Sequence, residues 1–150
     1  MNGTIVERIG RGGSVYVDSM VIIYFIESHE RYLAVVSDLF KGVDRGEIKA
    51  FSSYLTLLEV LVRPLEEGRL DLVEEYKKIL LNAEGFQLFP INGEIAERGA
   101  EIRAHYRFRT PDAVQLATAL CKNASVFVTN DRELKKFDQV KVLLLEELVT

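Results

Sequence analysis

The sequence has one cysteine, no tryptophan and no apolar stretch of membrane-spanning length. The single thiol, Cys121, excludes an intrachain disulfide framework and a zinc site built from cysteines. The longest apolar run, residues 20–26, has seven residues, far fewer than the ~20 that a transmembrane helix needs. The N-terminus shows neither the basic leader nor the apolar core of a signal peptide. These absences predict a cytoplasmic protein that does not contact a membrane.

Histidine is also scarce, and His29 and His105 stand far apart without the spacing of a zinc motif. The chain of 150 residues is 48% hydrophobic and 28% charged, which is typical of a soluble globular protein. This length suits one ordinary domain with a buried core, so we expect a single domain over residues 1–150. The net charge of −4 argues, taken alone, against a nucleic-acid partner.

Short apolar strands alternate with amphipathic helical segments along the chain. Alternation of this kind predicts an α/β fold with a mainly parallel central sheet. Residues 1–13, with "TIVERIGRGG", are expected to form either an extra edge strand or a disordered arm. The predicted strands are 14–19, 47–53, 86–90, 125–131 and 141–148. A first helix is predicted to begin at residue 20, and the further predicted helices are 31–46, 54–62, 70–85, 95–107 and 111–122.

Two helix boundaries carry specific capping signals. Ser53 suits the N-cap of helix 54–62, and Pro64 is expected to stop that helix because proline lacks the backbone N–H. Thr110 suits the N-cap of the last long helix, with Pro111 in its first turn.

Carboxylates follow two of the predicted strands at the point where each strand ends. Asp18 comes after "VYV", and Asp131 comes after "VFVTN". In open α/β sheets, ligands bind just beyond the carboxyl ends of the strands. The sequence therefore favours a ligand site there, although Asp18 alone is also typical of a turn and Asp131 of a helix cap.

Two further carboxylates occur in apolar helical segments. Glu59 lies within "TLLEVLVRP", where an unpaired buried charge would be costly. The alternative is a Glu59 on a solvent edge or paired with Arg63 four residues on. Asp112 lies in the first turn of its helix, where the helix dipole alone also favours an acidic residue.

If these four carboxylates converge, they repel one another unless a cation compensates their charge. Oxygen ligands without cysteine or histidine select Mg²⁺ or Mn²⁺. Such ions support hydrolysis of a phosphodiester by activating water and stabilising the leaving oxygen. The four acidic residues also account for the excess negative charge, so the net charge is weak evidence against a nucleic-acid substrate.

Four motifs, "VYVDSMVIIYFIE", "TLLEVLVRP", "TPDAVQLATAL" and "VFVTNDREL", together resemble the PIN-domain ribonucleases, and among them the VapC-type toxins of toxin–antitoxin pairs. The resemblance implies a PIN-like three-layer α/β/α sandwich with a mainly parallel central sheet. It assigns the catalytic and metal-binding roles to Asp18, Glu59, Asp112 and Asp131. It places Ser19, Thr129 and Asn130 beside them as supporting residues that orient carboxylates or metal-bound water.

The resemblance further implies a Mg²⁺- or Mn²⁺-dependent endoribonuclease that cleaves RNA, forms a homodimer and is held inactive by an antitoxin. A housekeeping RNA-processing nuclease and a non-catalytic PIN-like module that binds RNA or protein are the alternatives. A phosphatase that uses an Asp nucleophile is a poor fit, because it requires a second Asp where this chain has Met20. A receiver domain is a poor fit as well, because the late strand ends in Thr-Asn-Asp rather than before a lysine.

Basic residues precede Asp112 in "RGAEIRAHYRFRT". Arg103 and Arg107 are four residues apart and are expected to share a helix face, and with Arg109 they are the predicted RNA-binding residues. Tyr106 and Phe108 alternate with them, as base stacking would require. The alternative is an ordinary solvated helix face whose aromatic side chains belong to the core.

Overall fold

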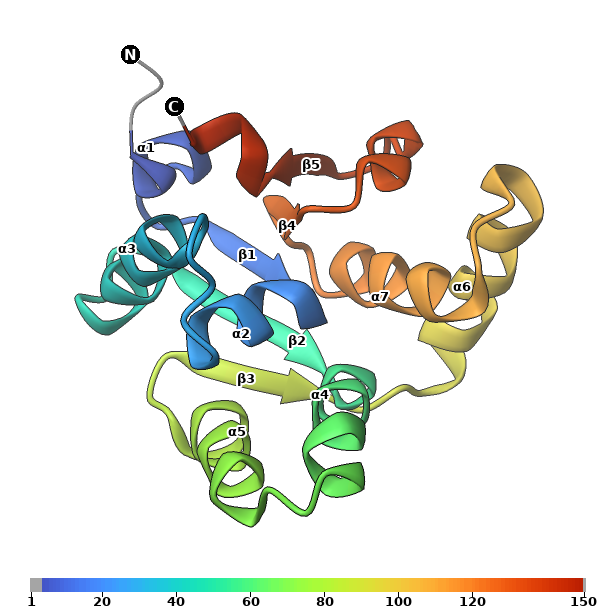
Figure 1. The fold of residues 1–150 in the computed structure, drawn as a ribbon. Coiled ribbons are helices and arrows are strands. Elements are labelled where there is room, and N and C mark those ends of the chain that lie inside the picture. Colours follow the sequence, from blue (N-terminus) through green and yellow to red (C-terminus); the bar gives the residue numbers. More distant parts are fainter. Residues whose placement is uncertain (1–3, 150) are drawn as a thin grey trace.

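A five-stranded, all-parallel sheet runs through the middle of the computed structural model, which describes residues 4–149 (Figure 1). Its strand order is β3-β2-β1-β4-β5, and every neighbouring pair is parallel. The predicted parallel α/β sheet is confirmed. The strands are β1 (Ser14–Val17), β2 (Lys49–Ser53), β3 (Phe86–Phe89), β4 (Val126–Thr129) and β5 (Lys141–Leu144).

Helices cover both faces of the sheet and form the outer layers of an α/β/α sandwich (Figure 1). Alternating side chains of each strand feed two separate cores, so that Val15 and Val17 enter one core and Tyr16 the other. This two-sided burial explains why the central strands are almost continuously apolar. One layer contains α1 (Ile5–Ile9), α2 (Ser19–Ile26), α3 (Leu33–Asp44), α4 (Tyr54–Glu66), α5 (Leu70–Asn82) and the 3₁₀ turn η2 (Leu145–Leu148), and the other contains α6 (Gly93–Tyr106), α7 (Thr110–Cys121) and the 3₁₀ turn η1 (Arg132–Lys136).

The strands are added to the sheet first on one side of the central strand β1 and then on the other. From β1 the chain proceeds outward through β2 to β3, and it then crosses over to β4 and β5 on the other side of β1. The neighbours β1 and β4 therefore flank a topological switch point. In open α/β sheets the loops leave such a point in opposite directions and open a ligand-binding crevice at the carboxyl ends.

The segment before β1 is a helix, so the expected edge strand or disordered arm is wrong for its described part. Helix α1 has a capping box in which the Thr4 hydroxyl accepts from the Glu7 backbone N–H and the Glu7 carboxylate accepts from the Thr4 N–H. Val6 of α1 packs directly on Gly42 of α3. The first three residues of this prediction lie outside the described part of the chain.

Helix α4 runs through Pro64 and ends at Glu66, so the prediction that Pro64 stops it is wrong. The proline ring is buried. Two backbone hydrogen bonds close the last turn after it: the Glu67 N–H donates to the Arg63 carbonyl, and the Arg69 N–H donates to the Pro64 carbonyl. This burial offsets the missing backbone bond. No helix within residues 4–149 is long and apolar enough to cross a membrane.

The N-terminal caps of α4 and α7 also differ from the sequence prediction. Ser53 is the N-cap residue of α4, but its side chain does not cap the helix and instead contacts the Tyr16 hydroxyl. The N-cap residue of α7 is Arg109 and not Thr110, which is already helical. This shift of one residue places Asp112 at the third position of α7, still in its first turn.

Candidate active site

Two of the predicted carboxylates follow the strands that flank the switch point, Asp18 at once after β1 and Asp131 two residues after the end of β4. Asp18 is the N-cap residue of α2, and its Oδ1 accepts from the Val21 N–H at 3.3 Å. Asp131 is the N-cap residue of η1, and its Oδ1 accepts from the Glu133 N–H at 3.0 Å. Their positions after adjacent parallel strands bring both residues to the carboxyl edge of the sheet.

Asp18 is buried, with 6% of its surface exposed. Burial raises the pKa of its carboxyl group to about 7, and the negative charge of Glu59 contributes in the same direction. Hydrogen bonds from the Thr129 side chain and from the Val21 and Met20 N–H groups oppose this rise of the pKa. An anionic Asp18 is thus unfavourable in this environment unless a positive charge comes close.

Glu59 reaches the same edge from the second turn of α4. Its Oε1 accepts from the Ser19 hydroxyl at 2.5 Å and from the Gln115 side-chain amide at 3.0 Å. The alternative pairing with Arg63 is not formed, because Arg63 contacts Glu67 instead. Two donors from α2 and α7 therefore fix one oxygen of Glu59 toward the start of α2.

A buried polar network lies behind Glu59, and its central residue, Gln115, is absent from the sequence prediction. The Gln115 side-chain oxygen accepts from the Tyr16 hydroxyl at 3.2 Å and from the Thr56 hydroxyl at 3.5 Å, while its amide donates to Glu59. Burial raises the pKa of Tyr16 to about 12, which keeps its hydroxyl protonated. The i, i+3 spacing of Asp112 and Gln115, which places both on one helix face, was the available sequence signal.

Asp112 is half-buried at the start of α7 and forms an ion pair with Arg109, whose Nε lies 3.3 Å from Oδ2. Burial raises the pKa of Asp112, the adjacent Arg109 opposes this, and the negative charge of Asp131 adds to the rise. The start of η1 therefore brings a second negative charge, that of Asp131, toward the Asp112 carboxylate. Because Arg109 is largely exposed, this ion pair contributes little to stability.

The four carboxylates thus fall into two coupled pairs, Asp18 with Glu59 and Asp112 with Asp131. As the side chains stand, residues 4–149 contain no group of three or more His, Cys, Asp or Glu residues arranged to hold a metal ion. The donor chemistry nevertheless fits Mg²⁺ or Mn²⁺, since all four side chains offer oxygen and two of them have raised pKa values caused mainly by burial. A cation between the pairs would offset that unfavourable charge.

The three predicted supporting residues have different contacts. Ser19 donates to Glu59, as described above. Thr129 contacts Asp18 and also accepts from the Asp131 N–H at 3.1 Å, so it joins the two strand ends. The side chain of Asn130 accepts from the Glu146 N–H at 3.1 Å and therefore holds the C-terminal segment rather than a carboxylate.

The arginines before α7 do not lie as predicted. Arg107 is the C-cap residue of α6 in a left-handed conformation with φ of 64°, so it does not share a helix face with Arg103. Arg103 donates to the Phe108 carbonyl at 3.4 Å. Phe108 is buried in the core with Tyr106 stacked on it, and the expectation that these rings stack on RNA bases is replaced by a core role.

Parallel strands, a switch point and carboxylates after two neighbouring strands define an α/β protein with acidic side chains at the carboxyl edge of its sheet. A family model for the PIN domain matches residues 15–140, and the chain belongs to this family. The match includes every carboxylate of the two pairs. No curated protein matches the chain at a significant level.

Solved structures of the same fold include several toxins and toxin–antitoxin complexes. One is VapBC2 from Rickettsia felis, bound to a DNA fragment from its promoter, with a TM-score of 0.70, 14% identity and coverage of 87% of this chain and 98% of that chain. Another is VapC20 from Mycobacterium tuberculosis, a toxin that cleaves the sarcin–ricin loop, with a TM-score of 0.68, 12% identity and coverage of 85% and 98%. A third is DNA-bound VapBC from Salmonella typhimurium, with a TM-score of 0.66, 16% identity and coverage of 88% and 98%. At these identities the likeness shows the fold.

Proposed function

We propose that this protein is a Mg²⁺- or Mn²⁺-dependent endoribonuclease and the toxin of a toxin–antitoxin pair. One observation carries the proposal: Asp18 and Asp131 follow adjacent parallel strands, and Glu59 is hydrogen-bonded to Ser19, the residue after Asp18. The negative charge of Asp131 in turn raises the pKa of Asp112. Membership of the PIN family and the likeness to VapC20, an RNA-cleaving toxin, support it. A cytoplasmic location, where RNA substrates occur, is part of the proposal.

In this proposal Asp18, Glu59, Asp112 and Asp131 hold the ion. When bound, such an ion lowers the pKa of water and stabilises the leaving oxygen of a phosphodiester. Ser19 and Gln115 keep Glu59 oriented, and Thr129 holds Asp18 and the start of η1 in register. Arg109 neutralises Asp112 in the absence of the ion and is free to turn to the RNA backbone when the ion is bound.

The proposal is tested by calorimetric titration of Mn²⁺ into metal-stripped protein, with Asp112→Asn and the matched variant Asp38→Asn alongside. Asp38 is an exposed carboxylate on α3, away from the site. We expect saturable binding by the wild type and by Asp38→Asn, and a loss of affinity of at least about tenfold in Asp112→Asn. Cleavage of total cellular RNA with and without Mn²⁺ then follows in the same three proteins.

Metal binding that Asp112→Asn retains would remove this residue from the site. Wild-type protein that is folded and binds no Mn²⁺ would favour the non-catalytic module, which binds RNA or protein without cleaving it. Metal-dependent cleavage without a neighbouring antitoxin gene would instead favour a housekeeping RNA-processing nuclease.

An antitoxin protein is the proposed inhibitor, since the Rickettsia felis and Salmonella typhimurium structures contain VapBC complexes. The coupled carboxylate pairs supply its target, because a basic side chain inserted between them would offset the same charge that a metal ion offsets. Co-expression with the neighbouring small gene should yield a complex in which Mn²⁺ binding is lost. A complex that still binds Mn²⁺ with unchanged affinity would contradict inhibition at this edge.

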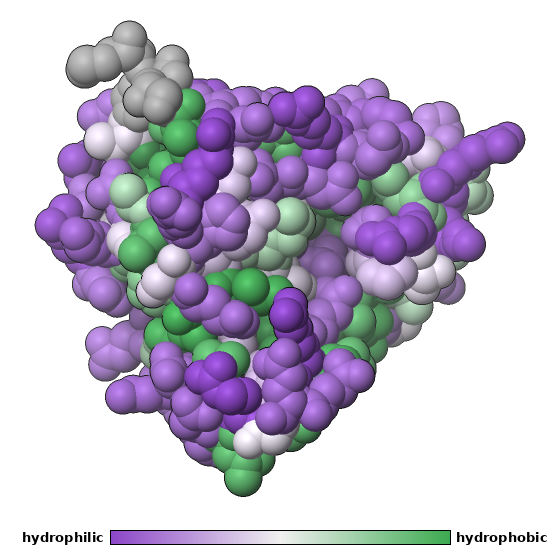
Figure 2. All heavy atoms as spheres, in the orientation of Figure 1, coloured by the Kyte–Doolittle hydropathy of each residue, from purple (hydrophilic) through white to green (hydrophobic). Residues whose placement is uncertain are grey.

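A second copy of the chain is the other proposed partner. One face of α4 exposes Tyr54, Leu58, Val62 and Leu65 at helical spacing, and Leu58 is 59% exposed. Figure 2 shows hydrophobic surface at the lower tip of the molecule, where α4 is joined to α5, and a broader hydrophobic area over α2 in the middle of the same face. A contiguous apolar face of this kind marks a protein interface, and a two-fold dimer would bury it on both copies.

A further inference from the structure

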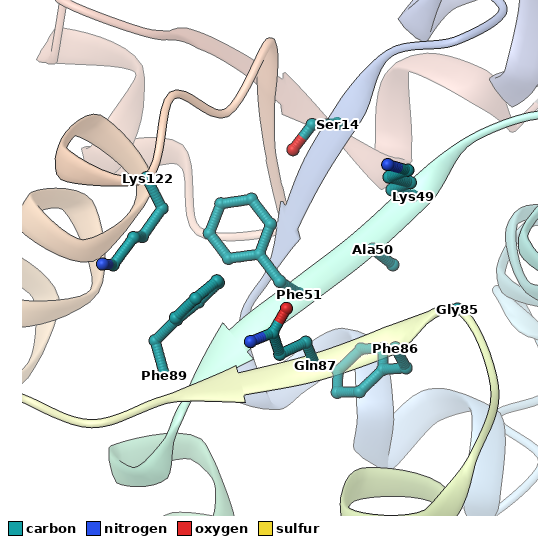
Figure 3. A pocket seen from close by; sticks show the side chains of 9 residues that line it. All are labelled: Ser14, Lys49, Ala50, Phe51, Gly85, Phe86, Gln87, Phe89 and Lys122. Atoms are coloured by element: carbon teal, nitrogen blue, oxygen red, sulfur yellow. The ribbon is translucent and has the colours of Figure 1, made fainter.

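A hollow of about 550 Å³ opens on the sheet (Figure 3). It lies over the starts of β1 and β2 and along β3, and it is bordered by Lys122 at the end of α7. Its volume falls within the roughly 300–1,000 Å³ of small-molecule sites. Ser14 and Lys49 begin strands of four and five residues, which at about 3.3 Å per residue places this part of the hollow more than 10 Å from the carboxyl ends of β1 and β2.

Strand alternation explains which side chains face this hollow. Ala50, Phe86 and Leu88 point to the core beneath α2, α3 and α5, so their neighbours Lys49, Phe51, Gln87 and Phe89 point to the opposite face. On that face α7 packs against β2, while the helix that packs against β3, α5, lies on the other face. The edge of the sheet at β3 therefore stays open and forms the floor of the hollow.

The lining combines three phenylalanines, Phe51, Phe86 and Phe89, with two lysines and contains no acidic residue. Phe51 and Phe89 meet edge to face, with ring centroids 5.4 Å apart, and the Lys122 Nζ lies 4.8 Å from the Phe89 centroid. Lys49 forms no ion pair within the described part of the chain, and the Gln87 amide has no hydrogen-bond partner among the same residues. Figure 3 shows Lys49 and Lys122 on opposite sides of the hollow, with Phe51 between them.

We propose that this hollow is a binding site for a free mononucleotide, with the base against Phe89, whose ring is backed by the buried Phe51, and the phosphate held by Lys49. A purely apolar ligand would make no polar contact with the two lysines or the Gln87 amide. An isolated phosphate would make no contact with the phenylalanine rings. A base also offers polar edges that the Gln87 amide can read, as protein side chains do with unpaired bases. In a chain of net charge −4, a concave surface that contains lysines and no carboxylate attracts an anion selectively.

The proposal is tested with AMP added to the ¹⁵N-labelled full chain in EDTA, followed by amide NMR shifts. We expect saturable shifts at the starts of β2 and β3 and none at Ser19 or Asp112. Lys49→Gln should weaken the affinity by about tenfold, because it removes a charge-assisted contact to phosphate. Phe89→Leu should weaken it by about fivefold or more, because it removes a stacking surface.

Lys41→Gln is the matched control, because Lys41 is an exposed lysine on α3 without an ion pair among residues 4–149. It should bind AMP like the wild type, and so should Asp112→Asn, whose defect belongs to the proposed nuclease site. The proposal is overturned if AMP gives no saturable shifts or shifts only at the acidic edge. It is also overturned if Lys41→Gln weakens binding as much as Lys49→Gln does, or if inorganic phosphate or adenosine alone binds as well as AMP.

Discussion

Asp18 combines the deepest burial among the four site carboxylates with a place at the N-cap of α2, and this combination makes the stability of the metal-free protein depend on pH. Its pKa is raised from 3.8 to about 7 in the folded protein. Between those pH values the folded state binds more protons than the unfolded state. Stability therefore falls as pH rises through this range, and the full loss is present above pH 7.

Asp18→Asn should consequently raise the melting temperature of metal-stripped protein by several degrees at about pH 8 and leave it almost unchanged at about pH 4. Asparagine suits the N-cap as well as aspartate does, so the helix start is preserved. Differential scanning calorimetry across this pH range measures the effect, with the exposed Asp38→Asn as the control. A lower melting temperature of Asp18→Asn at pH 8 would contradict the burial argument.

Gln115 should act as a positioning residue for Glu59. Gln115→Leu removes the donor to Glu59 and leaves the Tyr16 and Thr56 hydroxyls without their acceptor. We expect a loss of about 1–3 kcal/mol in the free energy of unfolding, together with weaker Mn²⁺ binding. Gln115→Glu keeps the acceptor for both hydroxyls but places a second carboxyl group beside Glu59, so it should not recover stability at neutral pH. A Gln115→Leu variant with unchanged Mn²⁺ affinity would indicate a structural role alone.

For single residues, the sequence could indicate which carboxylates follow strands, but not which side chains surround those carboxylates. Strand ends are set by local patterns, so Asp18 and Asp131 could be named in advance. The contact between Gln115 and Glu59 joins α7 to α4, and the left-handed Arg107 depends on how α6 meets α7. Such contacts arise from packing between elements, which a local pattern does not encode.

Among the elements, the contact of α1 with α3 offers the sharpest test of packing. A Cβ added at Gly42 would lie 2.6 Å from the Val6 Cγ2. Gly42→Ala should thus displace α1 and lower the free energy of unfolding by about 1–3 kcal/mol in urea titrations. Mn²⁺ binding should not change, since α1 lies away from the acidic edge.

Gly99→Ala on α6 is the matched control, because the nearest atoms to its added Cβ lie 3.8 Å away. That substitution should be neutral or stabilise by up to about 1 kcal/mol through helix propensity. Adding Val6→Ala to Gly42→Ala should restore part of the loss by removing the clashing methyl group. A Gly42→Ala variant as stable as Gly99→Ala would show that α1 is not held against α3.

Most elements could be predicted from their apolar periodicity, including all five strands and the helices from α2 to α7. The failures have physical causes. Helix α1 is short, and its three apolar residues, Ile5, Val6 and Ile9, fit a strand nearly as well as a helix. The capping box and the contact with α3 favour the helix. Proline usually ends a helix, but the Pro64 ring is buried within α4 and the helix continues past it.

For the whole molecule, the apolar face of α4 predicts the state of association. Leu58→Glu together with Leu65→Glu should convert a dimer of twice the chain mass into a monomer, because each charge would be buried in the interface. Light scattering coupled to gel filtration measures the mass. Leu81→Glu, on the exposed face of α5, is the control and should stay dimeric. A wild-type protein that is monomeric at all concentrations would refute the dimer.

The central position of β1 also has a consequence for how the protein is made. One edge of β1 pairs with β2, which follows soon after it in the chain. The other edge pairs with β4, which is translated much later. Until the ribosome has delivered β4, the neighbouring strand that carries Asp131 is missing and the crevice of the switch point does not exist. A nuclease of the proposed kind is therefore inert until β4 has been translated and has paired with β1.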